Sequence, residues 1–190
     1  KMNNIKIYNS KAEDSINIIK SNVDIKNISL FNSASDGLDC DFCNGSISNI
    51  NMGNIGGDGV DFSGSDLNVY IKSANKIKDK VASIGEETNI SIKIENVSNS
   101  FTAAAIKDGS RANIVLENIN TNGPFIMAYD KKGFYKKNTF ANVKYNYDNF
   151  KSEIFKYVRS SDVSLKVNDL NIPPSEIDVQ ALYKSGPMKK

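Results

Sequence analysis

Gly57–Asp58–Gly59–Val60–Asp61–Phe62–Ser63 decides the fold, because its pattern returns at a fixed interval along the chain. Twenty-two residues earlier the chain reads Ser35–Asp36–Gly37–Leu38–Asp39–Cys40–Asp41, and twenty-two later it reads Asp79–Lys80–Val81–Ala82–Ser83–Ile84–Gly85. Two apolar columns extend the interval: Ile16, Leu38, Val60, Ala82, Ala104 and Ile126, and Ile18, Cys40, Phe62, Ile84, Ile106 and Ala128. A fixed period of this length indicates a repeat architecture.

A second apolar segment follows in each repeat and ends in an apolar–x–Asn–apolar signature. It reads Ile25-Lys26-Asn27-Ile28, Ile47-Ser48-Asn49-Ile50, Ile94-Glu95-Asn96-Val97, Leu116-Glu117-Asn118-Ile119 and Phe140-Ala141-Asn142-Val143, whereas Ile71-Lys72-Ser73-Ala74 departs from it. Asparagine tolerates left-handed backbone and hydrogen-bonds to neighbouring main chain, so it suits a bend. If the repeats stack, these amides can form a ladder of hydrogen bonds.

The repeats predict an all-β fold, a right-handed parallel β-helix (a solenoid) of about six coils of about 22 residues each. The coils span 12–34, 35–56, 57–78, 79–101, 102–123 and 124–147. Helical repeats are disfavoured because the coils contain no helix-length amphipathic segment, and a leucine-rich horseshoe lacks its Leu-x-x-Leu-x-Leu framework here. The right-handed sense is expected because such connections dominate among parallel strands.

Two regions are expected: the β-helix over 1–147 and a small C-terminal cap over 148–190. Because the chain begins in mid-pattern with Ile5-x-Ile7, we expect its N-terminus to be truncated from a longer chain. A cap would cover the apolar cross-section and unpaired backbone of the last coil.

The cap sequence predicts three elements. One face of a short helix within 148–159 would carry Phe150, Ile154, Phe155 and Val158. A small hairpin follows, with strands at Val163–Val167 and Leu170–Ile172, and Pro173 and Pro174 end it. The tail over 185–190 is expected to be mobile.

The composition excludes several functional classes. Lys and Arg number 24 against 22 Asp and Glu, a net charge of +2, whereas a nucleic-acid-binding protein usually has a one-signed basic face. The absence of histidine removes the commonest general base, histidine-containing triads and imidazole-ligated zinc. No apolar run approaches the ~20 residues of a membrane-spanning helix. We therefore expect neither nucleic-acid binding nor membrane insertion.

The two cysteines, Cys40 and Cys43, form a lone Cys-x-x-Cys. One pair cannot make a four-ligand zinc site, and the βαβ pattern of thioredoxin-like proteins is missing. Cys40 falls in an inward column, so we interpret it as a small buried apolar residue. The redox state of the pair stays open.

Over about 12–147 the chain resembles the right-handed parallel β-helix, or pectate-lyase-like, superfamily. The resemblance rests on recurring phrases at Gly57–Ser65, Asp79–Lys80 with Ser83–Glu86, Lys107–Ser110, and Ala128–Tyr129 with Lys131–Lys132. It implies binding or cleavage of acidic and neutral polysaccharides. Neither the calcium-binding acids with an Arg base of the pectate-lyase pattern nor the Gly-His-Gly of the polygalacturonase pattern is complete here, so enzymatic activity stays undecided.

Catalytic candidates lie on the outward face of the first strand of each coil, where stacked neighbours stand ~4.8 Å apart. Asp39 and Asp61 would be adjacent like charges, which either raises one carboxyl pKa or recruits a hard cation through the carboxylate oxygens. A carboxyl with a raised pKa can provide a general acid for glycoside hydrolysis. Asp39 and the more distant Asp58 form an alternative pair. Lys107, or Lys80, is instead a candidate base for a polysaccharide lyase.

Seven further residues on this face are candidate substrate-binding groups: Asp58, Lys80, Ser83, Glu86, Asp108, Tyr129 and Lys131. The Tyr129 ring could lie against a sugar. A purely structural interpretation is also open, because Asp36–Gly37 and Asp58–Gly59 are ordinary turn sequences and outward polar residues favour solubility.

We therefore expect a polysaccharide-binding or polysaccharide-processing β-helix, located outside the cell or at its surface, with a glycan as partner. The alternative is a non-catalytic stalk or adhesin-type module whose partners are other domains of the same chain. The sequence demands no cofactor and identifies no metal ligand set. Calcium is the one cofactor considered, because Gly56–Asp61 approaches a nonapeptide calcium repeat once, where tandem copies are needed.

Overall fold

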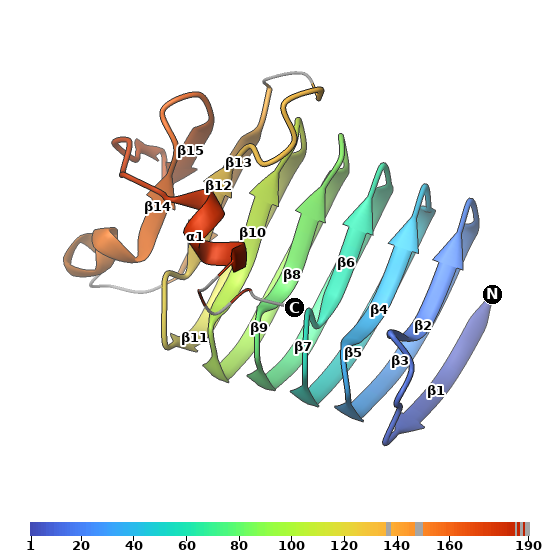
Figure 1. Cartoon of the computed structure of the whole chain (residues 1–190). Helices are drawn as coiled ribbons and strands as arrows, with labels where there is room; N and C mark the ends of the chain where they lie inside the picture. Colours follow the sequence, from blue (N-terminus) through green and yellow to red (C-terminus); the bar gives the residue numbers. More distant parts are fainter. Residues whose placement is uncertain (136–137, 147–149, 185, 187, 189–190) are drawn as a thin grey trace.

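The computed structural model is a parallel β-solenoid of about seven turns (Figure 1). It describes residues 1–135, 138–146, 150–184, 186 and 188. The predicted all-β solenoid is thus confirmed, with about seven turns in place of the six expected. The right-handed sense stays a prediction.

Each turn contributes one short and one long strand to two sheets. The seven-stranded sheet contains β2 (Asp14–Ile19), β4 (Asp36–Asp41), β6 (Val60–Ser63), β8 (Lys80–Gly85), β10 (Thr102–Lys107), β12 (Ile126–Tyr129) and β14 (Tyr157–Arg159). The nine-stranded sheet contains β1 (Met2–Tyr8), β3 (Asn22–Ser33), β5 (Asn44–Ile55), β7 (Asp66–Ile77), β9 (Asn89–Ser100), β11 (Arg111–Thr121), β13 (Phe140–Tyr145), β15 (Ser164–Val167) and β16 (Leu170–Asn171). Neighbouring strands pair in parallel, except β15 with β16.

The predicted apolar columns stack in register and form the core. Leu38 pairs with Val60, and Val60 pairs with Ala82. Cys40 pairs with Phe62 in the second column, and all five side chains are fully buried. From β2 to β12, a 22-residue step therefore moves a residue of a short strand to the same place on the next coil, which aligns the outward side chains of these strands as well.

The predicted asparagine ladder is present at a bend within the long strands. Asn27 and Asn49 both have φ of 57°, and the Asn49 side-chain amide donates to Asn27 Oδ1 over 2.9 Å. Asn118 donates to Asn96 Oδ1 over 3.1 Å in the same way. The ladder is interrupted at Ile71-Lys72-Ser73-Ala74, where the signature has no asparagine. There the side-chain amide of Asn96 donates instead to the main-chain oxygen of Lys72.

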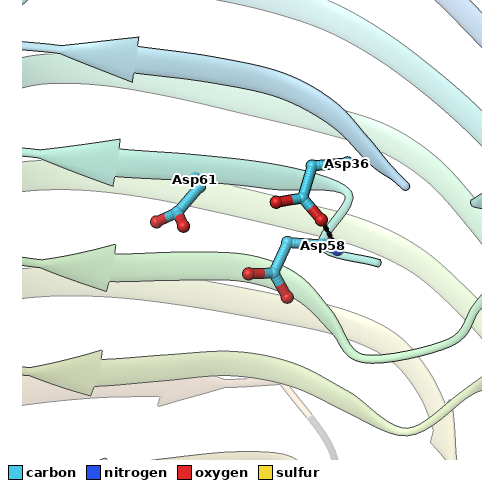
Figure 2. A group of neighbouring side chains, drawn as sticks. All are labelled: Asp36, Asp58 and Asp61. Carbon is cyan, nitrogen blue, oxygen red and sulfur yellow. Dashed lines mark hydrogen bonds between the residues drawn. The ribbon is translucent and has the colours of Figure 1, made fainter. Parts of the chain in front are cut away.

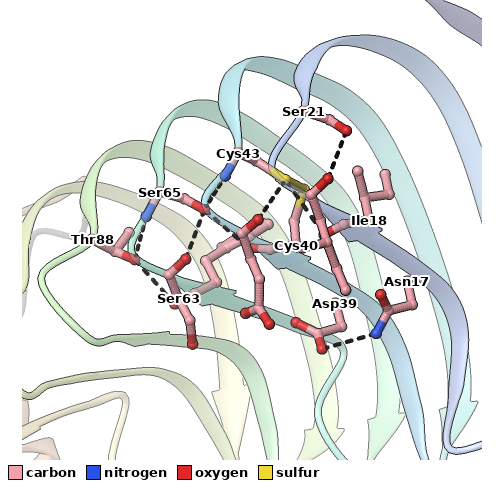
Figure 3. Close-up of a disulfide and its surroundings, with 12 residues drawn as sticks. Asn17, Ile18, Ser21, Asp39, Cys40, Cys43, Ser63, Ser65 and Thr88 are labelled. Atoms are coloured by element: carbon pink, nitrogen blue, oxygen red, sulfur yellow. Dashed lines mark hydrogen bonds between the residues drawn. A yellow bond between two sulfur atoms is a disulfide. The ribbon is translucent and has the colours of Figure 1, made fainter.

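A hydroxyl ladder and a disulfide hold the corner that follows the short strands (Figure 3). The Cys43 amide donates to Ser65 Oγ over 2.8 Å, and the Ser65 amide donates to Thr88 Oγ1 over 3.2 Å. Cys40 is buried as predicted, and it is bonded to Cys43. The sequence did not indicate this bond, because a spacing of three residues fits a disulfide only where the chain turns between them.

The C-terminal region continues the solenoid beyond the expected limit. The boundary between 147 and 148 lies outside the described residues, but β14 pairs in parallel with β12 and β15 with β13. The expected helix is a 3₁₀ helix over Phe150–Lys156, and the chain then enters β14, so Val158 lies in a strand. An interval of 31 residues between paired Ala128 and Arg159 hides this turn from a 22-residue pattern.

The predicted hairpin is confirmed as the antiparallel pair β15–β16. After it, α1 (Val179–Lys184) folds back against the outer side of the seven-stranded sheet (Figure 1). The expected mobile tail lies mostly outside the described residues, although Met188 within it is buried.

Candidate functional site

The predicted site face is the outer side of the seven-stranded sheet. Its register is as expected, because Asp39 pairs with Asp61 and Asp61 pairs with Ser83. On the later coils the same column continues with Ala105 and Met127. The face therefore changes from acidic to apolar along the solenoid.

The apolar half of this face is covered by the C-terminal segment. Ala105, Met127 and Tyr129 form a second buried cluster with Met188, and α1 packs Leu182 against it. The part of the predicted site face on the later coils is therefore closed to solvent, because the chain supplies its own cover there.

Several expected substrate-binding groups are consequently inaccessible. Lys80 is 1 % exposed, and Ser83 and Tyr129 are fully buried. The Tyr129 hydroxyl lies 2.7 Å from the hydroxyl of Tyr183 on α1. The Tyr129 ring therefore contacts the C-terminal segment that covers the face, and it does not offer a surface to a sugar.

The acidic half contains three converging carboxylates, those of Asp36, Asp58 and Asp61 (Figure 2). One oxygen of each lies within 4.8 Å of the others. Asp36 starts β4 and its Oδ1 accepts the Asp58 amide over 2.8 Å, so one carboxylate joins two coils. The turn interpretation of Asp36 and Asp58 is thus partly correct, but it leaves the third carboxylate unexplained.

A buried ion network adjoins these carboxylates. The Lys80 ammonium lies 2.9 Å from Asp58 Oδ1 and 2.5 Å from Asp79 Oδ2. Burial alone would lower the pKa of Lys80, but the two carboxylates hold it above its ordinary value. Burial, and then the charge of Asp58, raises the pKa of Asp79 to about 6. Lys80 thus acts as a fixed cation inside the protein and not as a free base.

Asp39 is the most perturbed carboxyl on the open part of this face. Burial raises its pKa to about 7, and the charges of Asp41 and Asp61 act in the same direction. The charge of the predicted neighbour Asp61 therefore contributes to the raised pKa of Asp39, although the burial of Asp39 has the larger effect on it. A carboxyl with this pKa holds a proton near neutral pH.

The remaining candidates gather in a separate group at the far end of the face. Asp108 Oδ1 accepts the amides of Lys131 and Lys132 over 2.7 Å each, so this 1 % exposed carboxylate holds a loop. The Glu86 carboxylate accepts from the Lys132 ammonium and from the Tyr135 hydroxyl.

Two of the three lysine candidates, Lys107 and Lys131, lie in this second group. The Lys131 ammonium lies 3.8 Å from the centre of the Tyr183 ring, and burial, then the charges of Lys107 and Lys80, lower its pKa. Lys107 pairs in register with Tyr129, two coils beyond Ser63. The structure therefore does not bring Lys107 into one site with Asp39 and Asp61.

Sequence reasoning missed a shallow groove of about 570 Å³ on the outer surface of the nine-stranded sheet. We call it the outer groove, and its lining is Ser46, Ser48, Asn68, Val69, Tyr70, Ser91, Ile92, Lys93, Asn113, Ile114, Val115, Asn142 and Lys144. It crosses five consecutive coils, from β5 to β13.

One side of the outer groove is a column of small polar side chains. Strand register aligns Ser46, Asn68, Ser91, Asn113 and Asn142. Their spacing in the sequence drifts from 22 to 29 residues, so a fixed-period search does not find them. The alternation of polar residues with buried Val69 and Ile92 was the signal available.

Tyr70 provides an aromatic side chain on the other side of the groove. Its hydroxyl donates to the Glu95 carboxylate, which fixes the ring. The Lys93 ammonium lies 5.4 Å from the ring centre and 2.8 Å from Glu117 Oε1. The groove thus combines a positioned ring with amides and hydroxyls, and Lys93, one of its two lysines, is already paired.

Comparison of the chain with protein-family models, curated proteins and solved structures found no match. The resemblance to the pectate-lyase-like superfamily therefore stays an expectation, whereas the solenoid is observed. Among the described residues, no helix is long and apolar enough to cross a membrane.

Proposed function

We propose that the protein is a carbohydrate-binding module that holds a linear, neutral polysaccharide along the outer groove. The observation that carries the proposal is the column of Ser and Asn side chains repeated on five consecutive coils beside Tyr70. Coils stack ~4.8 Å apart, a distance comparable with the rise of one sugar unit in an extended chain.

The chemistry of the groove favours sugar hydroxyls over other ligands. Side-chain amides and hydroxyls both donate and accept hydrogen bonds, as sugar hydroxyls do. Tyr70 offers an apolar ring face to a pyranose. A peptide strand cannot add here, because the main chain of the inner strands already pairs on both sides. The pairing of Lys93 with Glu117 favours a neutral polymer over an anionic one.

Affinity electrophoresis in gels containing a β-glucan, a mannan or pectate tests the proposal. We expect retardation by a neutral polymer, and about tenfold weaker binding by Tyr70→Ala, since an aromatic contact of this kind contributes up to about 1.5 kcal/mol. Tyr8→Ala is the matched control, because Tyr8 is an exposed tyrosine on β1, outside the groove.

The proposal fails if no polymer retards the wild type, or if both tyrosine variants bind equally well. Failure to bind any polymer would favour the non-catalytic stalk or adhesin-type module, whose partners are other domains of the same chain.

Glycoside hydrolysis at Asp39 and Asp61 is a second candidate, favoured by the raised pKa of Asp39 beside a second carboxylate. A reducing-end assay on the same polymers tests it. Release of sugar ends by the wild type but not by Asp39→Asn supports hydrolysis, and no release by the wild type excludes it.

An extracellular or cell-surface location is proposed together with this function. The Cys40–Cys43 disulfide supports it, because such bonds persist mainly in oxidising compartments. Fractionation of the native protein, with thiol alkylation before lysis, would test the location and the bond together.

A further inference from the structure

One lysine and two aspartates form an ion network at the start of β8 that is almost completely shielded from water. The Lys80 ammonium lies 2.9 Å from Asp58 Oδ1 and 2.5 Å from Asp79 Oδ2. The side chains of Lys80, Asp58 and Asp79 are 1 %, 2 % and 4 % exposed. Removing such charges from water costs about as much free energy as their attraction returns, so stability alone explains this network poorly.

The main chain holds the ammonium of Lys80 against the carboxylate of Asp58. The Lys80 amide donates to Asp58 Oδ1 over 3.2 Å, and the Gly59 amide donates to the Lys80 oxygen over 2.8 Å. The carboxyl carbon of Asp58 therefore lies at most one bond length beyond the oxygen that the ammonium contacts. Groups held with their reacting atoms about 3–3.5 Å apart can react far faster than free groups in solution.

The C-terminal segment keeps water away from this pair. The Lys80 ammonium lies 5.6 Å from the centre of the Tyr183 ring on α1, and Tyr129 beside it is fully buried. In solution, hydration of the ions favours a separate amine and carboxylate over their amide. A buried site lacks that hydration, so it favours the neutral amide and also protects it from hydrolysis.

We infer that Lys80 and Asp58 condense to an intramolecular amide, a covalent cross-link between the coils that carry β6 and β8. One proton passes from the Lys80 ammonium through Asp79 to the Asp58 carboxylate. The Lys80 nitrogen then attacks the Asp58 carboxyl carbon, and the C–N bond forms as one C–O bond breaks. A second proton from the same nitrogen leaves with the departing oxygen. One water is released, Asp79 is regenerated, and the step needs no co-reactant.

Asp79 is placed to relay both protons. Its Oδ2 contacts the ammonium, and its buried Oδ1 finds no donor among the residues that the structure describes. Burial, and then the charge of Asp58, raises the pKa of Asp79 to about 6, so this carboxyl can gain and lose a proton near neutral pH. Because the two carboxylates hold the pKa of Lys80 above its ordinary value, the reaction depends on this relay.

Intact-mass spectrometry of the full chain tests the inference. The folded wild type should be one water lighter than its sequence and its disulfide require. After digestion with trypsin, one branched peptide should join Asp58 to Lys80, and cleavage after Lys80 should be lost. Asp79→Asn and Lys80→Arg should keep the full mass. Lys78→Arg is the matched control, because Lys78 is an exposed lysine two residues away and its loss should leave the cross-link intact.

The inference is overturned if the folded wild type has its full mass, both when purified and after prolonged incubation at neutral pH. It is equally overturned if hydroxylamine restores the missing water, because Asp58–Gly59 can instead form a cyclic imide, which this reagent opens. A branched peptide that persists in Asp79→Asn would overturn the role of Asp79. Circular dichroism establishes that each variant is folded. Should a variant not fold, the branched peptide of the wild type decides alone. The cross-link is separate from the outer groove and does not depend on glycan binding.

Discussion

At the scale of single residues, the open acidic face brings several carboxyl groups of like charge close together. Asp39 lies among Asp14, Asp36, Asp41 and Asp61, and burial together with these charges raises its pKa to about 7. An aspartate in the unfolded chain has a pKa near 3.9. The folded state therefore holds the Asp39 proton more tightly, and ionisation between these two pH values opposes folding.

The sign of this effect predicts the pH dependence of stability. Because the folded pKa is raised, Asp39 should contribute a loss of stability as the pH rises from about 4 to about 7, and little beyond. In EDTA, Asp39→Asn should gain about 1 kcal/mol at pH 7.5, after allowance for solvent screening, and almost nothing at pH 4. Chemical denaturation at both pH values measures this, with Asp66→Asn as control. An equal change at both pH values would exclude ionisation as the cause.

At the scale of strands and corners, the sequence determined much of the structure. Strict alternation and a 22-residue step located the inward positions of β4, β6, β8 and β10, because each strand repeats one side-chain pattern. The asparagine ladder followed from the same step. The step failed where an insertion intervened, as between Ala128 and Arg159, and there the additional turn was missed.

Substitution at an inward position tests these strand assignments. Phe62 is fully buried in β6, so Phe62→Asp places a charge in the solenoid core and should cost more than about 4 kcal/mol of unfolding free energy. Asn68→Asp, at an exposed position of β7, should change stability by less than about 0.5 kcal/mol. Thermal and denaturant unfolding of both variants measure the difference. Comparable stabilities would mean that the inward and outward assignments are exchanged.

At the scale of the whole molecule, two long-range features decide which surfaces can bind a ligand. The C-terminal segment covers the apolar half of the predicted site face, through contacts such as Tyr129 with Tyr183, 54 residues apart. A contact of this kind leaves no periodic signal, so the sequence alone could not reveal that Ser83 and Tyr129 are buried. Conversely, the outer groove arises only after the coils stack and bring Asn68, Ser91 and Asn113 together.

Stacking in register is the central claim, and a cross-linking measurement tests it most directly. Asn68 and Ser91 are exposed partners on adjacent coils, whereas Asn68 and Asn113 are two coils apart. With ~4.8 Å per coil and an upper limit of about 7 Å for a disulfide, only the first pair can bond. Under mild oxidation, Asn68→Cys/Ser91→Cys should form an intramolecular disulfide detected by mass spectrometry, and Asn68→Cys/Asn113→Cys should not. Equal bonding in both pairs, or bonding in the second alone, would contradict the stacked solenoid.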